Sequence, residues 1–149
     1  MNIKSCAFSG HRVLQSDFDI KLLENGVCDL IKRGTQVFYC GMAKGFDLIA
    51  AETVLKYKKE GIKLIACVPY EGQEDSMNKT DKLRYKDILS FCDEKVVFAP
   101  HYNFRCMYAR NRYMVENCDV LVSYLRKESG GTYYTVNYAK TCDKKVIEI

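Results

Sequence analysis

The sequence lacks the long apolar segment that a membrane-spanning helix requires. No apolar run approaches the roughly 20 residues needed to cross a bilayer. The first ten residues turn polar too soon for a secretory signal, and their apolar run is typical of a strand. We therefore expect a cytosolic protein with no membrane partner.

Paired metal-binding or disulfide spacing is also missing, although the chain has eight cysteines. The cysteines are spread along the sequence with no CxxC pair, and several lie inside apolar runs. The two histidines, His11 and His101, show no ligand spacing. This pattern argues against a disulfide scaffold and against a zinc site, so we expect free structural thiols and no bound metal.

A basic stripe is absent as well. The formal net charge is +4, and lysines and arginines are mixed with acidic residues on the expected helix faces. A dedicated duplex-DNA binder concentrates its positive charge, so nucleic acid is not the expected partner. The chain also has no internal repeat, low-complexity tract or linker. Residues 1–149 are therefore expected to form a single domain.

Short apolar runs alternate with longer segments of helical spacing. The runs predict strands at residues 3–8, 36–40, 62–68, 95–99, 119–124 and 145–149. The segments between them predict helices from about 17 to Gly34, about 47 to 60, 80–92, from a cap at Asn103 to about 117, and from about 132 to 142. Strict alternation indicates right-handed crossovers and a mostly parallel sheet. The predicted fold is a Rossmann-like, three-layer α/β/α sandwich.

Small or glycine-rich turns follow three of the expected strands. They are Ser9-Gly10-His11-Arg12, the segment from Gly41 to Asp47, and Gly130-Gly131-Thr132. Ligands of open parallel sheets bind beyond the carboxyl ends of the strands, near the topological switch point. Glycine lets a ligand approach the backbone, and a helix N-terminus suits an anion. The three turns together favour a phosphate-bearing ligand, although neither a Walker P-loop nor a GxGxxG fingerprint is present.

These turns supply the candidate binding residues. Hydroxyl donors come from Ser9 and Thr132, and positive charge from His11 and Arg12. A carboxylate, from Asp47 or from Glu52 about one turn further along the same helix, would contact ribose or base. The alternatives are turn chemistry for each glycine, a helix cap for Asp47, and a solvated surface position for Glu52. The candidate set is Ser9, Gly10, His11, Arg12, Gly41, Gly45, Asp47, Gly130, Gly131 and Thr132.

Motifs along nearly the whole chain carry a family resemblance. They are residues 7–12 (AFSGHR), 41–47 (GMAKGFD), 50–52 (AAE), 108–115 (YARNRYMV) and 130–132 (GGT) with Val136, Tyr138 and Ala139. In these motifs the sequence resembles the SLOG superfamily, which includes the Smf/DprA and LOG proteins, and more narrowly its YpsA-like branch. The resemblance implies a Rossmann-like domain that holds a nucleotide or a derivative of the NAD or ADP-ribose type. It also implies a homo-oligomer that pairs through helix faces.

The LOG enzymes of this superfamily suggest an alternative, hydrolysis of the N-glycosidic bond of nucleoside 5′-monophosphates. Arg110 matches the arginine of their pattern. Their glycine-rich loop, however, carries a catalytic glutamate at the place where this chain has Thr135, and Lys127 replaces its proline. The candidate catalytic residues for this alternative are Arg110 and Glu52. The similarity to DprA suggests a further alternative, binding of single-stranded nucleic acid by some of the eleven tyrosines and seven phenylalanines.

Overall fold

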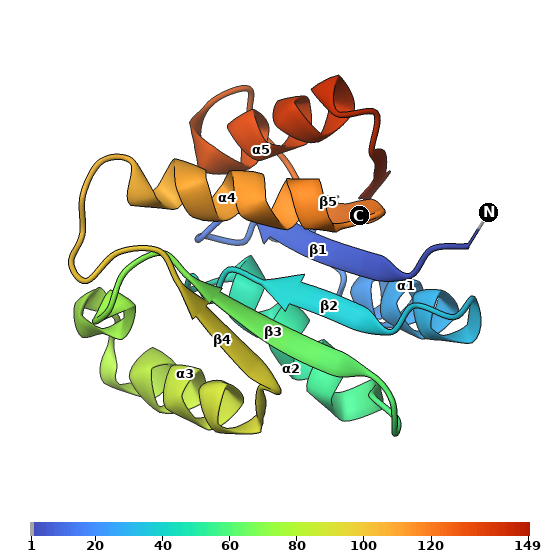
Figure 1. Ribbon diagram of the computed structural model, residues 1–149, viewed down its shortest axis with the longest axis horizontal. Helices are drawn as coiled ribbons and strands as arrows, with labels where there is room; N and C mark the ends of the chain where they lie inside the picture. Colours follow the sequence, from blue (N-terminus) through green and yellow to red (C-terminus); the bar gives the residue numbers. More distant parts are fainter. Residues whose placement is uncertain (1) are drawn as a thin grey trace.

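The computed structural model describes residues 2–149 as one six-stranded sheet with helices on both faces (Figure 1). The strands are β1 (Ser5–Gly10), β2 (Val37–Cys40), β3 (Lys63–Val68), β4 (Glu94–Val97), β5 (Val120–Tyr124) and β6 (Lys145–Glu148). The helices are α1 (Ile20–Lys32), α2 (Phe46–Tyr57), α3 (Lys79–Phe91), α4 (Cys106–Asn117) and α5 (Gly130–Thr141), with a short 3-10 helix, η1 (Gln73–Ser76), before α3.

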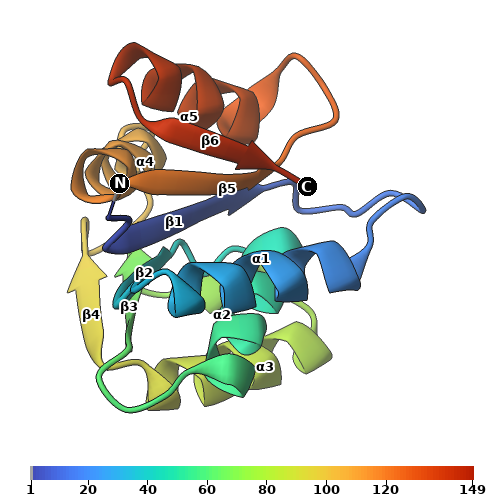
Figure 2. The same cartoon turned by 90° about the vertical axis from the view of Figure 1, so that its right-hand side faces the viewer.

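All neighbouring strands pair in parallel, in the order β4-β3-β2-β1-β5-β6. The chain moves outward from β1 to β4 and then returns to place β5 on the other side of β1. Helices α1, α2 and α3 cover one face of the sheet, and α4 and α5 cover the other (Figures 1 and 2). The predicted three-layer sandwich is confirmed, and the topological switch point lies between β1 and β5.

Alternating side chains along β1 divide the core between the two faces of the sheet. Cys6 and Phe8 belong to the cluster under α1, α2 and α3, whereas Ala7 belongs to the cluster under α4 and α5. Phe8 stacks on Phe38 of β2 with ring centroids 6.0 Å apart. The sheet is thus apolar on both sides, as a parallel sheet covered by helices should be.

The ends of α1 show how local chemistry sets the helix limits. The helix begins at Ile20, later than predicted, because Asp19 caps it: its Oδ1 accepts from the Lys21 N–H at 2.9 Å. Gly34, with φ +98°, follows the last turn and confirms the predicted C-terminal glycine. The predicted cap at Asn103 is wrong, because its side chain accepts from the Arg105 N–H and α4 begins only at Cys106.

The cysteines are all free thiols, as their spacing predicted, and most are buried. Burial raises the pKa of Cys67 to about 12 and that of Cys40 well above its usual range, which keeps both thiols protonated. Within residues 2–149, no group of three His, Cys, Asp or Glu side chains could hold a metal ion. No helix in that range is long and apolar enough to cross a membrane.

Candidate functional site

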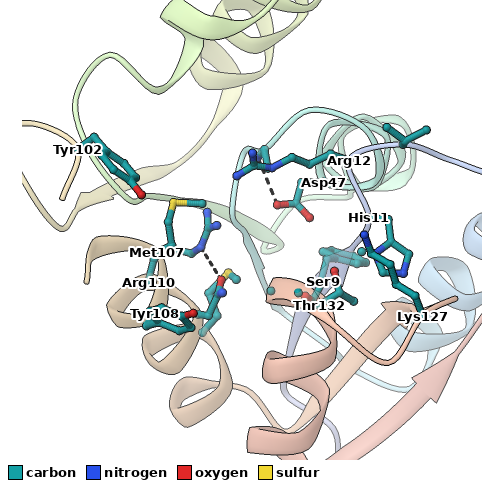
Figure 3. Close-up of a pocket in the computed structure, with 18 of the residues that line it drawn as sticks. Ser9, His11, Arg12, Asp47, Tyr102, Met107, Tyr108, Arg110, Lys127 and Thr132 are labelled. Atoms are coloured by element: carbon teal, nitrogen blue, oxygen red, sulfur yellow. Dashed lines mark hydrogen bonds between the residues drawn. The ribbon is translucent and has the colours of Figure 1, made fainter. Parts of the chain in front are cut away.

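A cavity of about 770 Å³ opens at the carboxyl edge of the sheet, at the switch point between β1 and β5. Its walls come from the end of β1, the loop that follows it, and the N-terminal turns of α4 and α5 (Figure 3). Ligand pockets in proteins commonly measure about 300–1,000 Å³. The cavity therefore has the size and the position expected of a small-molecule site in this fold.

The N-terminus of α5 forms one side of the cavity. Gly130, Gly131 and Thr132 line it, and no side chain caps the helix, so the N–H groups of the first turn are free to bind an anion. Among residues 2–149, neither the Thr132 hydroxyl nor the Ser9 hydroxyl opposite it has a hydrogen-bond partner. These groups form a cluster of free hydrogen-bond donors.

Two further cations border the cavity: Lys127 lies on the side of these donors and Arg12 lies near Asp47 (Figure 3). Arg12 and Lys127 both line the cavity and are exposed, and neither forms an ion pair within the described part of the chain. Sequence reasoning noted Lys127 only as a replacement for a proline and missed it as a site residue. A lysine within a polar loop gives no signal of its own, and only the fold brings it to the cavity.

The glycines of the candidate set fall into two groups. A Cβ at Gly131 would meet nothing within 4 Å, so its missing side chain leaves open space beside the cavity. A Cβ at Gly10 would lie 2.3 Å from the Phe46 ring, although Gly10 also lines the cavity. The missing side chain of Gly131 therefore leaves the cavity open beside α5, whereas Gly10 lacks a side chain because the Phe46 ring packs against it.

Gly41 and Gly45 do not line the cavity, and internal packing explains both. A Cβ at Gly41 would lie 2.5 Å from Nη1 of Arg110 and 2.8 Å from Oδ2 of Asp47. Gly45 has φ +80°, and a Cβ there would lie 2.3 Å from the carbonyl oxygen of Arg12. These two glycines let side chains and backbone of the site approach each other.

Arg110 reaches the cavity from α4 but is nearly fully buried. Its guanidinium donates to the carbonyl oxygens of Gly41 and Cys67, the latter at 3.4 Å, and to Oδ1 of Asn111 at 2.7 Å. Burial lowers the pKa of Arg110, while the charge of Asp47 opposes that shift. Arg110 therefore ties α4 to the ends of β2 and β3 and supplies a fixed positive charge beneath the cavity.

Asp47 lies on the other side of Gly41 and is the most unusual polar group of the site. It is only 6% exposed and lines the cavity from α2. Its Oδ2 accepts from the Ala43 N–H at 3.3 Å, but its Oδ1 has no partner within residues 2–149. Burial raises its pKa to about 6, against the opposing effect of Arg110. The cap role is excluded, because the residue at the N-cap of α2 is Gly45.

Glu52, the other carboxylate expected at the site, lies elsewhere, and that expectation is wrong. Its carboxylate pairs with Arg84 of α3 at 2.6 and 3.0 Å, and it does not line the cavity. Residues five apart on an α-helix are turned about 140° from each other, so Asp47 and Glu52 cannot share a face. The hydrolase alternative thereby loses its candidate catalytic carboxylate.

The expected charge of His11 also needs correction. His11 lines the cavity, but its Nε2 accepts from the Arg126 N–H at 2.8 Å, so the imidazole is neutral in this structure. Burial, with the nearby charges of Lys127 and Arg126, lowers its pKa. His11 therefore holds the loop after β1 against the loop after β5 and supplies no positive charge.

Arg126 strengthens the same connection between loops. Its guanidinium donates to Oδ2 of Asp17 at 2.7 Å and to the carbonyl oxygen of Ile149 at 2.8 Å, and it lies 4.2 Å above the Tyr124 ring. The Tyr124 hydroxyl donates to Asp17 as well. These contacts fix the side of the cavity on which the α5 N-terminus lies.

An aromatic wall, which sequence reasoning missed, forms the opposite side. Tyr102 and Phe104 of the loop before α4, and Met107 and Tyr108 of α4, line the cavity (Figure 3). Tyr102 is 64% exposed, Phe104 71% and Tyr108 50%. The sequence offered one indication of this wall: the polar loop 101–104 (HYNF) contains two aromatic residues, and a solvated loop does not need aromatic side chains for packing.

Three proteins of related sequence match most of the chain. UPF0398 protein BH1768 of Halalkalibacterium halodurans is 29% identical over 125 residues, which cover 80% of this chain and 66% of that protein. UPF0398 protein lwe1908 of Listeria welshimeri is 26% identical over 148 residues, covering 89% and 81%. The SPbeta prophage-derived protein YoqJ of Bacillus subtilis is 27% identical over 125 residues, covering 74% and 73%.

Solved structures of DNA processing protein A (DprA) share the fold. The Streptococcus pneumoniae protein superposes with a TM-score of 0.71 at 22% identity, over 98% of this chain and 50% of that one. The Helicobacter pylori protein, whose structure concerns single-stranded DNA binding, superposes with a TM-score of 0.69 at 18% identity, over 99% and 65%. This chain thus spans about half to two thirds of the DprA chains. At these identities the likeness establishes the fold alone.

A family model decides the assignment. The model of the YspA SLOG family matches residues 15–148, which is most of the chain and includes α2, α4 and the α5 turn that line the cavity. The segment before residue 15 contains the end of β1 and the start of the loop that follows it, and Ser9, Gly10, His11 and Arg12 of this segment line the same cavity. The chain belongs to the YspA SLOG family, as the motifs of its sequence predicted.

Proposed function

We propose that this protein binds a nucleotide or a nucleotide-derived ligand in the cavity between β1 and β5. The observation that carries the proposal is Asp47, which lines the cavity together with the uncapped N-terminus of α5 and whose buried Oδ1 lacks a partner within residues 2–149. An unsatisfied buried carboxylate oxygen costs free energy unless a ligand donates to it. A ribose hydroxyl is a donor of that kind.

Three regions of the cavity lining suit the three parts of a nucleotide. The N-terminus of α5, with Thr132, Ser9 and the nearby Lys127, suits a phosphate. Asp47 suits a ribose hydroxyl, and Tyr102 and Tyr108 offer ring faces and edges to a base. Because the anion side and the aromatic side face one cavity, a single ligand can contact both.

A thermal-shift screen tests the proposal. Nucleoside monophosphates, ADP-ribose, NAD and cyclic nucleotides are each added to the full chain, and a ligand at 100-fold its Kd should stabilise the fold by about 2.7 kcal/mol. Asp47→Asn should weaken the binding of a ribonucleotide far more than that of its 2′,3′-dideoxy analogue. Affinity for the ribonucleotide should also rise as the pH passes about 6, where Asp47 ionises. No shift with any compound would refute the proposal.

A second candidate function is binding of single-stranded nucleic acid, which the exposed Phe104 favours. The Arg105 guanidinium lies 5.3 Å from the centroid of its ring, so a stacking surface and a positive charge occur together at the cavity mouth. A steep loss of oligonucleotide affinity with added salt, together with a marked loss in Phe104→Ala, would support this candidate. Salt-independent or absent binding of the oligonucleotide would eliminate it.

A further inference from the structure

The strand β6 leaves one edge of the sheet unpaired. It lies at one end of the strand order, and among residues 2–149 only β5 pairs with it (Figure 2). The strand at the other end of the sheet is β4. An unpaired edge presents a row of free N–H and C=O groups, which can pair with a strand of another chain unless the edge is protected.

The register of β6 against β5 fixes which of its residues face outward. Ser123 pairs with Glu148, and the Ile149 N–H donates to the Ser123 carbonyl oxygen at 3.0 Å. In a parallel ladder, only every second residue of a strand turns its backbone groups toward a given neighbour. The odd-numbered residues of β6 therefore bond to β5, whereas the backbone N–H and C=O groups of Val146 and Glu148 point away from the sheet.

The charges of this edge are complementary to a second copy of the same edge. Lys144, Val146 and Glu148 alternate along the chain, so their side chains share the face of the sheet on which Val146 packs. A two-fold axis at Val146 sets Lys144 of one antiparallel copy opposite Glu148 of the partner subunit. An axis at Lys145 or at Glu148 would set like charges against each other, and one at Ile147 would face Glu148 with Val146.

The groups that this pairing uses are free in the described part of the chain. Lys144 and Glu148 form no ion pair there, and the Ser123 hydroxyl, at 3.0 Å, is the hydrogen-bond donor to the Glu148 carboxylate. Val146 and Ile147 pack against the core clusters on opposite faces of the sheet, yet each is only half-buried. A second strand at this edge would cover both side chains.

The β4 edge lacks this complementarity. By the same alternation, Lys95 and Val97 face outward there. A two-fold axis at Glu94 or at Lys95 would set like charges against each other, and one at Val96 or at Val97 would face Lys95 with an apolar residue. A lysine on an edge strand is a common protection against pairing. The two edges therefore differ, and β6 is the one suited to a partner strand.

We propose that two copies of this protein pair through β6, antiparallel, about a two-fold axis at Val146. Main-chain hydrogen bonds of Val146 and Glu148 and two ion pairs between Lys144 and Glu148 then join the two sheets into one. This interface is a strand edge, and not the helix faces that the family resemblance implies. Because the paired strands run in opposite directions, the carboxyl edges and their cavities open at opposite ends of the dimer.

Sedimentation equilibrium of the full chain over a range of concentrations tests this inference. The wild type should approach twice the mass of one chain. Lys144→Glu sets like charges against each other at both ends of the pair and should raise the dimer Kd at least about tenfold. The double variant Lys144→Glu, Glu148→Lys exchanges the charges and should restore the Kd to within about threefold of the wild type. Lys95→Glu, the same charge change on β4, is the matched control and should leave the Kd unchanged.

A second pair of variants tests the main-chain bonds. Val146→Pro removes an outward N–H that the β5 ladder does not use, and it should abolish the dimer. Val97→Pro removes an outward N–H of β4 and should leave the dimer intact, and far-UV circular dichroism checks that both variants fold. A monomer at every concentration of the wild type would overturn the proposal. So would a dimer that survives both Lys144→Glu and Val146→Pro, or a charge exchange that fails to restore pairing. None of these outcomes bears on ligand binding.

Discussion

At the scale of single residues, the carboxyl group of Asp47 links the stability of the fold to pH. Its pKa rises from 3.8 to about 6 on folding because burial outweighs the attraction of Arg110. The folded chain therefore keeps this proton to a higher pH than the unfolded chain does. Ionisation of Asp47 between about pH 4 and 6 lowers the free energy of unfolding.

Comparison with Asp47→Asn, which cannot titrate, isolates this effect. Between pH 4.5 and 7.5 the unfolding free energy of the wild type should fall by about 2 kcal/mol relative to that of the variant. Urea unfolding at the two pH values measures the difference. A difference that stays constant with pH would show that Asp47 has an ordinary pKa.

Gly131 carries a prediction in which stability and binding move in opposite directions. Gly131→Ala adds a Cβ that meets no protein atom within 4 Å, in the first turn of α5. The free energy of unfolding should stay level or rise by up to about 1 kcal/mol, whereas nucleotide affinity should fall about tenfold or more. Gly26→Ala is the matched control: it also meets open space, but within α1, and should stabilise the fold without changing affinity. Unaltered binding in Gly131→Ala would place the ligand away from α5.

At the scale of elements, two loops and a strand end are held together by one residue, Arg126, through its side chain and its backbone N–H. Arg126 binds Asp17 in the loop after β1 and the Ile149 carbonyl just beyond β6, and its own N–H binds His11. Arg126→Ala should cost about 1–2 kcal/mol of unfolding free energy and speed amide hydrogen exchange in residues 11–18. Arg33→Ala removes an exposed pair with Asp29 within one helix and should cost less than about 0.5 kcal/mol. Equal costs in the two variants would contradict the role given to Arg126.

The elements themselves were predictable, and physical reasons explain where prediction stopped. Every strand and every long helix follows from an apolar run or a helical period. Only η1 was not expected, and the ends of β1, β4, α1, α2, α4 and α5 differ from the predicted bounds by about two or three residues. Turn chemistry also located Ser9, Thr132 and Gly131 at one edge. The sequence did not predict where the side chains of Glu52 and His11 point. Glu52 pairs with Arg84 and His11 accepts from the Arg126 N–H, and both partners are distant in sequence. The aromatic wall was missed although two aromatic residues stand out in the polar loop 101–104, because only the fold shows that this loop borders the cavity.

At the scale of the whole molecule, the residues that line the cavity meet at the switch point between β1 and β5. Because β1 and β5 are neighbours whose following loops diverge, residues from the first ten positions and from beyond position 126 border the same space. The two glycines at Gly41 and Gly45 serve this convergence by letting Arg110, Asp47 and the Arg12 backbone approach one another. The site is thus a property of the assembled sheet, and no single segment contains it.

The unequal anchoring of the two cavity walls has a consequence for selectivity. The α5 side is fixed by the hydrogen bonds of Arg126 and His11, whereas the hydroxyls of Tyr102 and Tyr108 on the other side have no partner within residues 2–149, and ring contacts hold them. A stiff wall rejects ligands whose charges are misplaced, while a compliant wall adjusts to rings of different size. For the nucleotide ligand that we propose, the protein should therefore be strict about the position of the phosphates and tolerant of which base they carry.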